Sequence, residues 1–218
     1  MRACVARGPV APAELLASLG RPGSRTALRQ AVREMVAAGE LAYALEHGRT
    51  VLEASFDRPV RVSERITLAP PDRGGTPLGG GVLVRLTAGA AFGAGRHPTT
   101  RLALRGIDRA LQASGAPAGR SGRVLDVGTG TGVLAIAALA LGMQGGVGID
   151  LDPCAVVEAR DNVRLNGMDE RIRISDQPLE TVAGRFALLT ANLRPPTLVR
   201  LAGTLRALDH YRLANAAD

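Results

Sequence analysis

The feature that most constrains this chain is a glycine-rich turn between a β-branched run and an apolar helical segment. Val124–Val127 predicts a buried strand, and Val133–Ile136 begins a segment with helical spacing. The turn between them carries Gly128, Gly130 and Gly132. Glycine accepts positive φ angles without steric cost and lets a ligand approach the bare backbone. A strand, a tight glycine turn and a helix in this order indicate an α/β fold that cradles a nucleotide.

The spacing of the glycines indicates which nucleotide. A dinucleotide-binding fingerprint, G-x-G-x-x-G, would place its third glycine at position 133, where Val133 stands. The run from Asp126 to Gly132, D-x-G-x-G-x-G, instead resembles the first motif of the class I S-adenosylmethionine-dependent methyltransferases. That resemblance implies a Rossmann-like sheet, S-adenosyl-L-methionine as cofactor, and Asp126 among the cofactor-binding residues with the three glycines.

An acidic residue follows the next predicted strand, Val147–Ile149. Asp150 comes 18 residues after Gly132, about where a doubly wound fold places the acid that accepts hydrogen bonds from ribose hydroxyls. The alternative is that Asp150 caps the following helix. We predict that Asp152 and Pro153 are the N-cap and first residue of that helix, which ends near Asn166.

A second motif, F-G-x-G-x-H-P-T-T, runs from Phe92 to Thr100 and leads into a predicted helix. Thr99 or Thr100 can cap that helix, which leaves the N–H groups of its first turn available to a ligand carboxylate. His97 is either a proton acceptor or a residue that orders the loop.

Together these motifs resemble PrmA, the bacterial methyltransferase family that acts on the eleventh large-subunit ribosomal protein. The likeness is continuous from Phe92 to about Leu198, and Ala94 departs from it where the family usually has threonine. It implies a protein N-methyltransferase. The motifs that carry it are F-G-x-G-x-H-P-T-T, V-L-D-V-G-T-G-T-G-V-L, the stretch from Gly148 to Gly167 with Asn162 and Asn166, and Thr190-Ala191-Asn192-Leu193. The resemblance also implies that Thr100, Gly128, Asp150 and Asn192 hold the cofactor, or, for Asn192, the incoming amine.

Asn192 begins an N-L-R-P-P run at the carboxyl end of a predicted strand, Phe186–Thr190. Enzymes that methylate amino groups of nucleic-acid bases use N-P-P-Y there, with an aromatic ring that stacks on a flipped base. Pro196 is followed directly by Thr197 and not by an aromatic residue, so base methylation ranks low.

The N-terminal part predicts a separate domain over residues 1–60. Helices over Pro12–Leu19 and from Ser24 to about Ala38, then strands over Leu41–Leu45 and Thr50–Ala54, resemble a winged helix-turn-helix. Its second helix carries arginine at spacing four, at Arg25, Arg29 and Arg33, which fits either a nucleic-acid surface or a solvated helix face. Residues 61–90 predict a linker and a lead-in strand, and residues 91–218 the methyltransferase domain.

Composition narrows the class further. The chain has 218 residues and a formal charge of +7, yet all of its Lys and Arg are arginine, a bias expected of a GC-rich genome rather than of a nucleic-acid partner. No apolar run is long enough to span a bilayer and no signal-peptide pattern begins the chain, so we expect a cytoplasmic protein without a membrane partner. The three histidines and two cysteines have no metal-ligand spacing.

Only four strands of the sheet can be placed before the chain ends. A class I methyltransferase sheet has seven, so we expect the domain to be incomplete after its fourth strand, with an exposed edge that favours an oligomer. Three alternatives stay open: a methyltransferase for another protein or a small-molecule amine, a nucleic-acid-binding regulator, and an inactive fragment.

Overall fold

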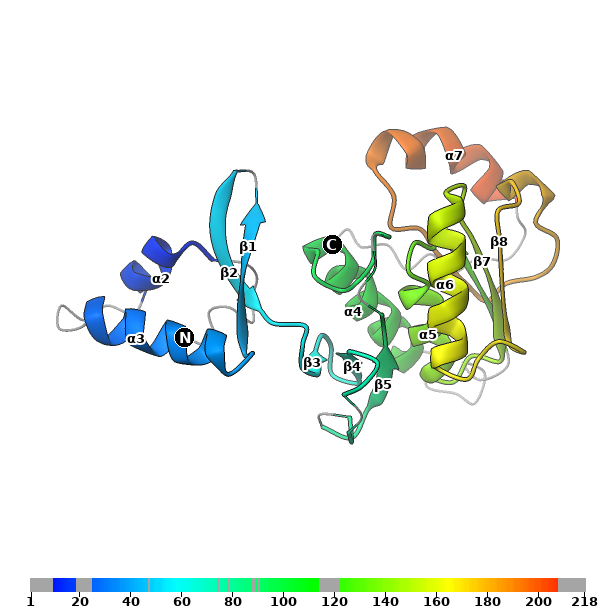
Figure 1. The fold of residues 1–218 in the computed structure, drawn as a ribbon. Coiled ribbons are helices and arrows are strands. Elements are labelled where there is room, and N and C mark those ends of the chain that lie inside the picture. The colour runs from blue at the N-terminus through cyan, green and yellow to red at the C-terminus, as the bar shows by residue number, and fades with distance from the viewer. Residues whose placement is uncertain are drawn as a thin grey trace. The chain divides into compact units, whose positions relative to one another are not determined.

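The chain divides into two units, Met1–Val60 and Arg61–Asp218 (Figure 1). The computed structural model describes residues 10–18, 25–46, 48–73, 75–77, 79–87, 89, 91–113 and 122–207. Each unit has its own buried core, and each is described by itself below.

The first unit contains two helices and a hairpin. Helix α2 (Pro12–Ser18) precedes α3 (Arg25–Ala37), and strands β1 (Leu41–Glu46) and β2 (Arg49–Ala54) pair antiparallel. Its core consists of Leu15, Val32, Leu41 and Leu52. The predicted order of helix, helix and hairpin is confirmed, while the winged-helix role stays a prediction. The side chains of Arg29 and Arg33 are exposed, Arg25 is the first residue of α3, and Ser24 lies outside the described residues.

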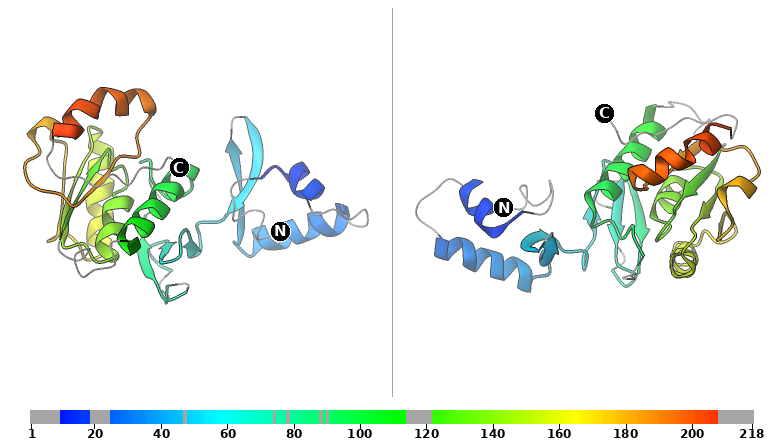
Figure 2. Two further views of the ribbon diagram at one scale, coloured as in Figure 1. Left: turned by 180° about the vertical axis from the view of Figure 1, so that it is seen from behind. Right: turned by 90° about the horizontal axis from the view of Figure 1, so that it is seen from above.

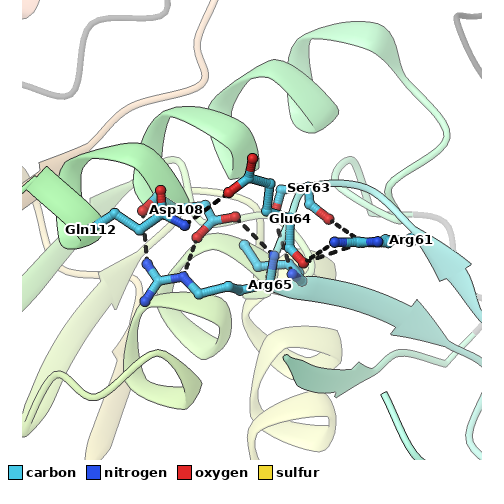
Figure 3. Close-up of polar contacts among 7 residues, drawn as sticks. Arg61, Ser63, Glu64, Arg65, Asp108 and Gln112 are labelled. Carbon is cyan, nitrogen blue, oxygen red and sulfur yellow. Dashed lines mark hydrogen bonds and ion pairs between the residues drawn. The ribbon is translucent and has the colours of Figure 1, made fainter. Parts of the chain in front are cut away.

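A small sheet occupies the stretch in which we expected a linker and one strand. Strands β3 (Val60–Arg61), β4 (Ile66–Ala69) and β5 (Val82–Arg85) lie in this order, and β4 and β5 pair parallel. All four residues of β4 are buried. Just before β4, Arg65 pairs with Asp108 of helix α4 (Pro98–Ala113), as Figure 3 shows. This contact fixes the start of β4 against α4.

The main sheet is parallel and four-stranded. Its strands are β6 (Arg123–Val127), β7 (Gly145–Ile149), β8 (Ile172–Ser175) and β9 (Leu188–Thr190), in the spatial order β8-β7-β6-β9. Numbered along the chain this order is 3-2-1-4, which confirms the doubly wound, Rossmann-like prediction. Within the described part of the chain, β9 pairs with β6 alone, so its other edge has no strand beside it.

Helices cover both faces of this sheet. Helix α5 (Val133–Ala140) contacts α4, β6 and β7, and α6 (Pro153–Leu165) packs on α5 and β8 (Figure 1). On the other face, Leu201 and Leu205 of α7 (Pro195–Ala207) and Leu179 of the 3₁₀ turn η2 (Leu179–Thr181) pack against the strands. Figure 2 shows α7 from behind and from above. Helix α7 begins with Pro195 and Pro196, because proline is tolerated in the first turn of a helix.

None of the helices in the described ranges is both long and apolar enough to cross a membrane.

Candidate functional site

The glycine turn between β6 and α5 adopts the backbone that its sequence predicts. Gly128, Gly130 and Gly132 have φ angles of 71°, 54° and 80°. A Cβ atom on Gly130 would lie 2.0 Å from the carbonyl oxygen of Phe92. Glycine is therefore required there both by the backbone angle and by the close approach of the Phe92 segment.

A cavity opens at the carboxyl ends of β6, β7 and β9, the edge at which doubly wound sheets bind ligands. Its volume is about 640 Å³, and its lining includes Phe92, His97, Gly128, Gly130, Asp150 and Asn192. An adjoining cavity of about 330 Å³ shares Gly128, Asp150 and Leu193 with it and is otherwise largely apolar, with Ile149, Leu151 and Leu179 in its wall. The two together have the size and the mixed character of a nucleotide site.

Asp150 lies where the two cavities meet. Its Oδ2 accepts a hydrogen bond from the N–H of Gly130 at 2.8 Å, and its Oδ1 accepts one from the N–H of Asp152 at 3.1 Å. A carboxylate has about four lone-pair positions, so both oxygens can accept further hydrogen bonds from a ligand. The alternative role, capping α6, belongs to Asp152, whose Oδ1 accepts from the N–H of Cys154.

Asp126 does not reach the cavity. Its side chain is fully buried, and its two carboxylate oxygens each accept a hydrogen bond of 2.7 Å, one from the hydroxyl of Thr129 and one from that of Thr190. Residues alternate between the faces of a strand, which turns Asp126 toward α5. Asp126 thus joins the glycine turn to β9 through two hydrogen bonds, and its place among the cofactor-binding residues stays a prediction.

Burial shifts the titration of Asp126. It raises the pKa of this carboxyl from 3.8 to about 6, against the opposing effect of the hydrogen bonds from Thr129 and Thr190, and the nearby charge of Asp150 adds to the rise. Burial removes the water that would stabilise the charged carboxylate, so the neutral form is favoured and the pKa rises.

Thr100 and Asn192 are 92 positions apart in the chain but lie next to each other in the structure. The Asn192 Nδ2 group donates to the Thr100 hydroxyl at 3.3 Å. Asn192 lines the cavity, whereas Thr100 is fully buried behind it. Of the two predicted ligand-binding residues, the structure therefore places one at the cavity and the other in support of it.

His97, rather than a threonine, occupies the N-cap of α4. The helix begins at Pro98, and the carbonyl of His97 accepts the first helical hydrogen bond, from the N–H of Arg101. The Nδ1 atom of His97 accepts from the N–H of Thr99 at 3.3 Å and lies 2.7 Å from its hydroxyl. The prediction of a threonine cap is wrong, and the geometry favours the loop-ordering role of His97.

Asn162 was not among the predicted site residues, yet it holds the glycine turn. Its Nδ2 donates to the carbonyl of Thr131 at 2.9 Å. In the sequence, Asn162 stands out only as part of the motif between Gly148 and Gly167, and nothing in that motif indicates a contact with Thr131. Among the described side chains no group of three or more His, Cys, Asp or Glu could hold a metal ion.

Comparison with known proteins gives this site a family. Residues 52–210 match the family model described as ribosomal protein L11 methyltransferase (PrmA). A protein of that name from Geobacter sulfurreducens is 41% identical over 149 residues, which cover 68% of this chain and 46% of that protein. Another from Xylella fastidiosa is 40% identical and covers 72% of this chain and 53% of its own length.

A solved structure supports the same assignment. The crystal structure of ribosomal protein L11 methylase from Lactobacillus delbrueckii subsp. bulgaricus superimposes with a TM-score of 0.60 at 32% identity, covering 69% of this chain and 74% of that one. The chain spans about half the length of the curated relatives it matches. The family model covers well over half of the chain. From these matches and the shared motifs, the chain belongs to the ribosomal protein L11 methyltransferase (PrmA) family.

Proposed function

We propose that this chain binds S-adenosyl-L-methionine in the cavity between the glycine turn and α7, and that it forms the cofactor-binding part of an enzyme that methylates amino groups of ribosomal protein L11. The observation that supports this most directly is the meeting of Gly128, Gly130 and Asp150 at one cavity. Family membership supports the reaction and the substrate.

The residues present fit the cofactor. Gly128 and Gly130 line the cavity, so the backbone of the turn would face the ligand. Asp150 would accept from the ribose hydroxyls, and the apolar cavity beside Ile149 and Leu151 would hold the adenine ring. Asn192 would contact the amino acid portion or the incoming amine from the rim of the larger cavity.

Methyl transfer requires mainly that the cofactor and the amine be held in the right relative position. When bound, the cofactor supplies a methyl group on a cationic sulfur, whose departure as a neutral thioether makes the carbon electrophilic. The chain then needs to orient the two reactants and exclude water. The Nδ1 atom of His97 accepts a hydrogen bond from the N–H of Thr99 at the start of α4, so we assign no proton transfer to this residue.

Titration calorimetry with S-adenosylmethionine and S-adenosylhomocysteine tests the cofactor. We expect saturable binding by the unaltered chain and a loss of at least about tenfold in Asp150→Ala, because a carboxylate that accepts ligand hydroxyls is removed. Asp169→Ala changes an exposed acid in the turn after α6 and serves as control. A folded sample that binds neither compound would overturn the proposal.

The acceptor is tested separately. Transfer of a labelled methyl group to purified L11, compared with other ribosomal proteins and with small amines, distinguishes the proposed substrate from the alternatives. Labelling of L11 alone supports the proposal, and labelling of a different acceptor replaces L11 in it while leaving the cofactor site unaffected.

A further inference from the structure

We propose that α6 positions one wall of the cofactor cavity through a clamp formed by Glu158, Asn162 and Asn166, and that Asn162 is the positioning residue that joins this wall to the glycine turn. The inference rests on the proposed cofactor site and extends it to residues that do not line the cavity.

Glu158 and Asn162 lie in α6, and Asn166 is the C-cap residue of that helix. Their spacing of four places them on the same face of the helix. Each accepts a hydrogen bond from the backbone at the end of β5 or between β5 and the Phe92 motif, at Arg85, Thr87 or Ala91. The N–H of Arg85 donates to Asn166 Oδ1 at 2.9 Å, the N–H of Thr87 to Asn162 Oδ1 at 2.9 Å, and the N–H of Ala91 to Glu158 Oε2 at 2.9 Å.

The side chains of the clamp make hydrogen bonds that a neighbouring strand would otherwise make. Strand β5 is at the edge of its sheet among the described residues, and the N–H of Leu86 after it still donates to Ala69 of β4. On the side that faces away from β4, the backbone has no neighbouring strand to pair with. The Asn166 side chain supplies both halves of a backbone pair, since its Nδ2 also donates to the carbonyl of Arg85 at 2.7 Å. Buried backbone groups need such partners, and α6 provides them.

Asn162 contacts both sides of the cavity wall. It is fully buried, and its Oδ1 accepts from the N–H and the hydroxyl of Thr87, while its Nδ2 donates to the carbonyl of Thr131 in the glycine turn. The N–H of Thr131 in turn donates to the carbonyl of Phe92 at 3.0 Å. The glycine turn is thus bound through Thr131 to the Phe92 motif on one side and to Asn162 on the other.

Close packing accompanies these hydrogen bonds. A Cβ atom on Gly89 would lie 2.1 Å from the carboxyl carbon of Glu158. The segment therefore lies directly on α6, and the clamp sets where Phe92 and Gly130 lie along the cavity. An error of about 1 Å in such positions is enough to weaken a site substantially.

Asn162→Ala tests the clamp against a matched control on the same helix, Val156→Ala, which also truncates a buried side chain. Two readouts are compared at a temperature where both variants are folded: the dissociation constant for S-adenosylhomocysteine and the hydrogen exchange of the Thr131 amide. We expect Asn162→Ala to bind at least about tenfold more weakly than Val156→Ala. We also expect faster exchange at Thr131 in Asn162→Ala alone.

A second variant covers a failure to fold. Asn162→Leu has a side chain of similar size but loses both the acceptor for Thr87 and the donor to Thr131, so it should show the same two effects. Equal binding and equal Thr131 exchange in the Asn162 variants and Val156→Ala would overturn the clamp while leaving the cofactor site in place. Absence of binding by the unaltered chain would overturn the proposed function and the clamp together.

Discussion

Asn192 donates a hydrogen bond from Nδ2 to the hydroxyl of Thr100, across 3.3 Å and 92 positions of the chain. The contact joins the end of β9 to the first turn of α4, behind the cavity. Both residues belong to motifs that resemble the same family, and the structure shows why they occur together: one orients the other.

Thr100→Val removes this hydroxyl without changing the shape of the side chain. We expect the unfolding free energy to change by no more than about 1 kcal/mol, because the partly exposed Asn192 amide can bond to water instead. Binding of S-adenosylhomocysteine should weaken about three- to tenfold, since Asn192 loses its orientation. Calorimetry measures the binding, and Thr50→Val, an exposed position on β2, is the control. Unchanged affinity would show that Thr100 does not act through Asn192.

Gly130→Ala should remove cofactor binding. A methyl group there meets the backbone oxygen of Phe92, which cannot rotate away as a side chain would. The displaced turn and the strained φ angle should cost about 1–3 kcal/mol of unfolding free energy. Gly203→Ala on α7 is the matched control, because nothing lies within 4 Å of its Cβ position.

Comparison of the two glycine variants separates the general effect of an added methyl group from its effect in the glycine turn. In the interior of a helix alanine is favoured over glycine by up to about 1 kcal/mol. The urea concentration at the midpoint of denaturation should therefore be unchanged or slightly higher in Gly203→Ala. Binding by Gly130→Ala at the affinity of the unaltered chain would contradict the role assigned to the turn.

The order of the main strands and the glycine turn could be predicted because their signals are local. A β-branched run before alternate glycines and an apolar helix permits few other structures. Short apolar stretches carry less information. Strand β4 has only four residues and lies between a polar turn and two prolines, so Ile66–Ala69 was expected to be part of a linker.

The side-chain roles at the site were harder to predict. Spacing alone does not tell which face of a strand a residue occupies, and that choice separates buried Asp126 from Asp150 at the cavity. The contacts of Asn162 and Asn166 with the segment before Phe92 join residues 75 to 81 positions apart. No local pattern marks contacts of that kind, since they depend on how α6 packs after the chain has folded.

Asp126 should make stability depend on pH in an unusual direction. Its folded pKa of about 6 exceeds the unfolded value of 3.8, so between these values the folded state binds more protons. The cost of burying the charged carboxylate is therefore removed as the pH falls from 6 to 4, and the contribution of Asp126 to the unfolding free energy becomes more favourable. In Asp126→Asn this contribution is absent at every pH.

We expect the stability of Asp126→Asn, relative to the unaltered chain, to decrease by up to about 3 kcal/mol as the pH falls from 7 to 4. The lost hydrogen-bond geometry adds an offset that does not vary with pH. Urea denaturation at several pH values measures the difference, and Asp176→Asn, an exposed acid after β8, is the control. A difference that stays flat across this range would show that Asp126 does not titrate there.

Asp108 should act in the opposite sense. Burial alone would raise the pKa of this carboxyl, but hydrogen bonds from Ser63 and Arg65 and the positive charge of Arg65 outweigh it, so the pKa is lowered. Arg65 donates to the carboxylate of Asp108 twice, from Nε to Oδ1 at 2.6 Å and from its backbone N–H to Oδ2 at 3.0 Å (Figure 3). The stabilising contribution is present above the unfolded pKa of 3.8 and is lost as the pH falls through the lower folded value.

Asp108→Asn should therefore lower the unfolding free energy by about 1–3 kcal/mol at pH 7. The deficit should shrink below the unfolded pKa of 3.8, because there the unfolded state of the unaltered chain takes up a proton at Asp108 before the folded state does. Asp161→Asn breaks an exposed pair with Arg164 and should have little effect at either pH, because water screens it. Urea denaturation at pH 7 and pH 3 measures both. A deficit of equal size at the two pH values would assign the stabilisation to packing of the small sheet on α4 rather than to the charge of Asp108.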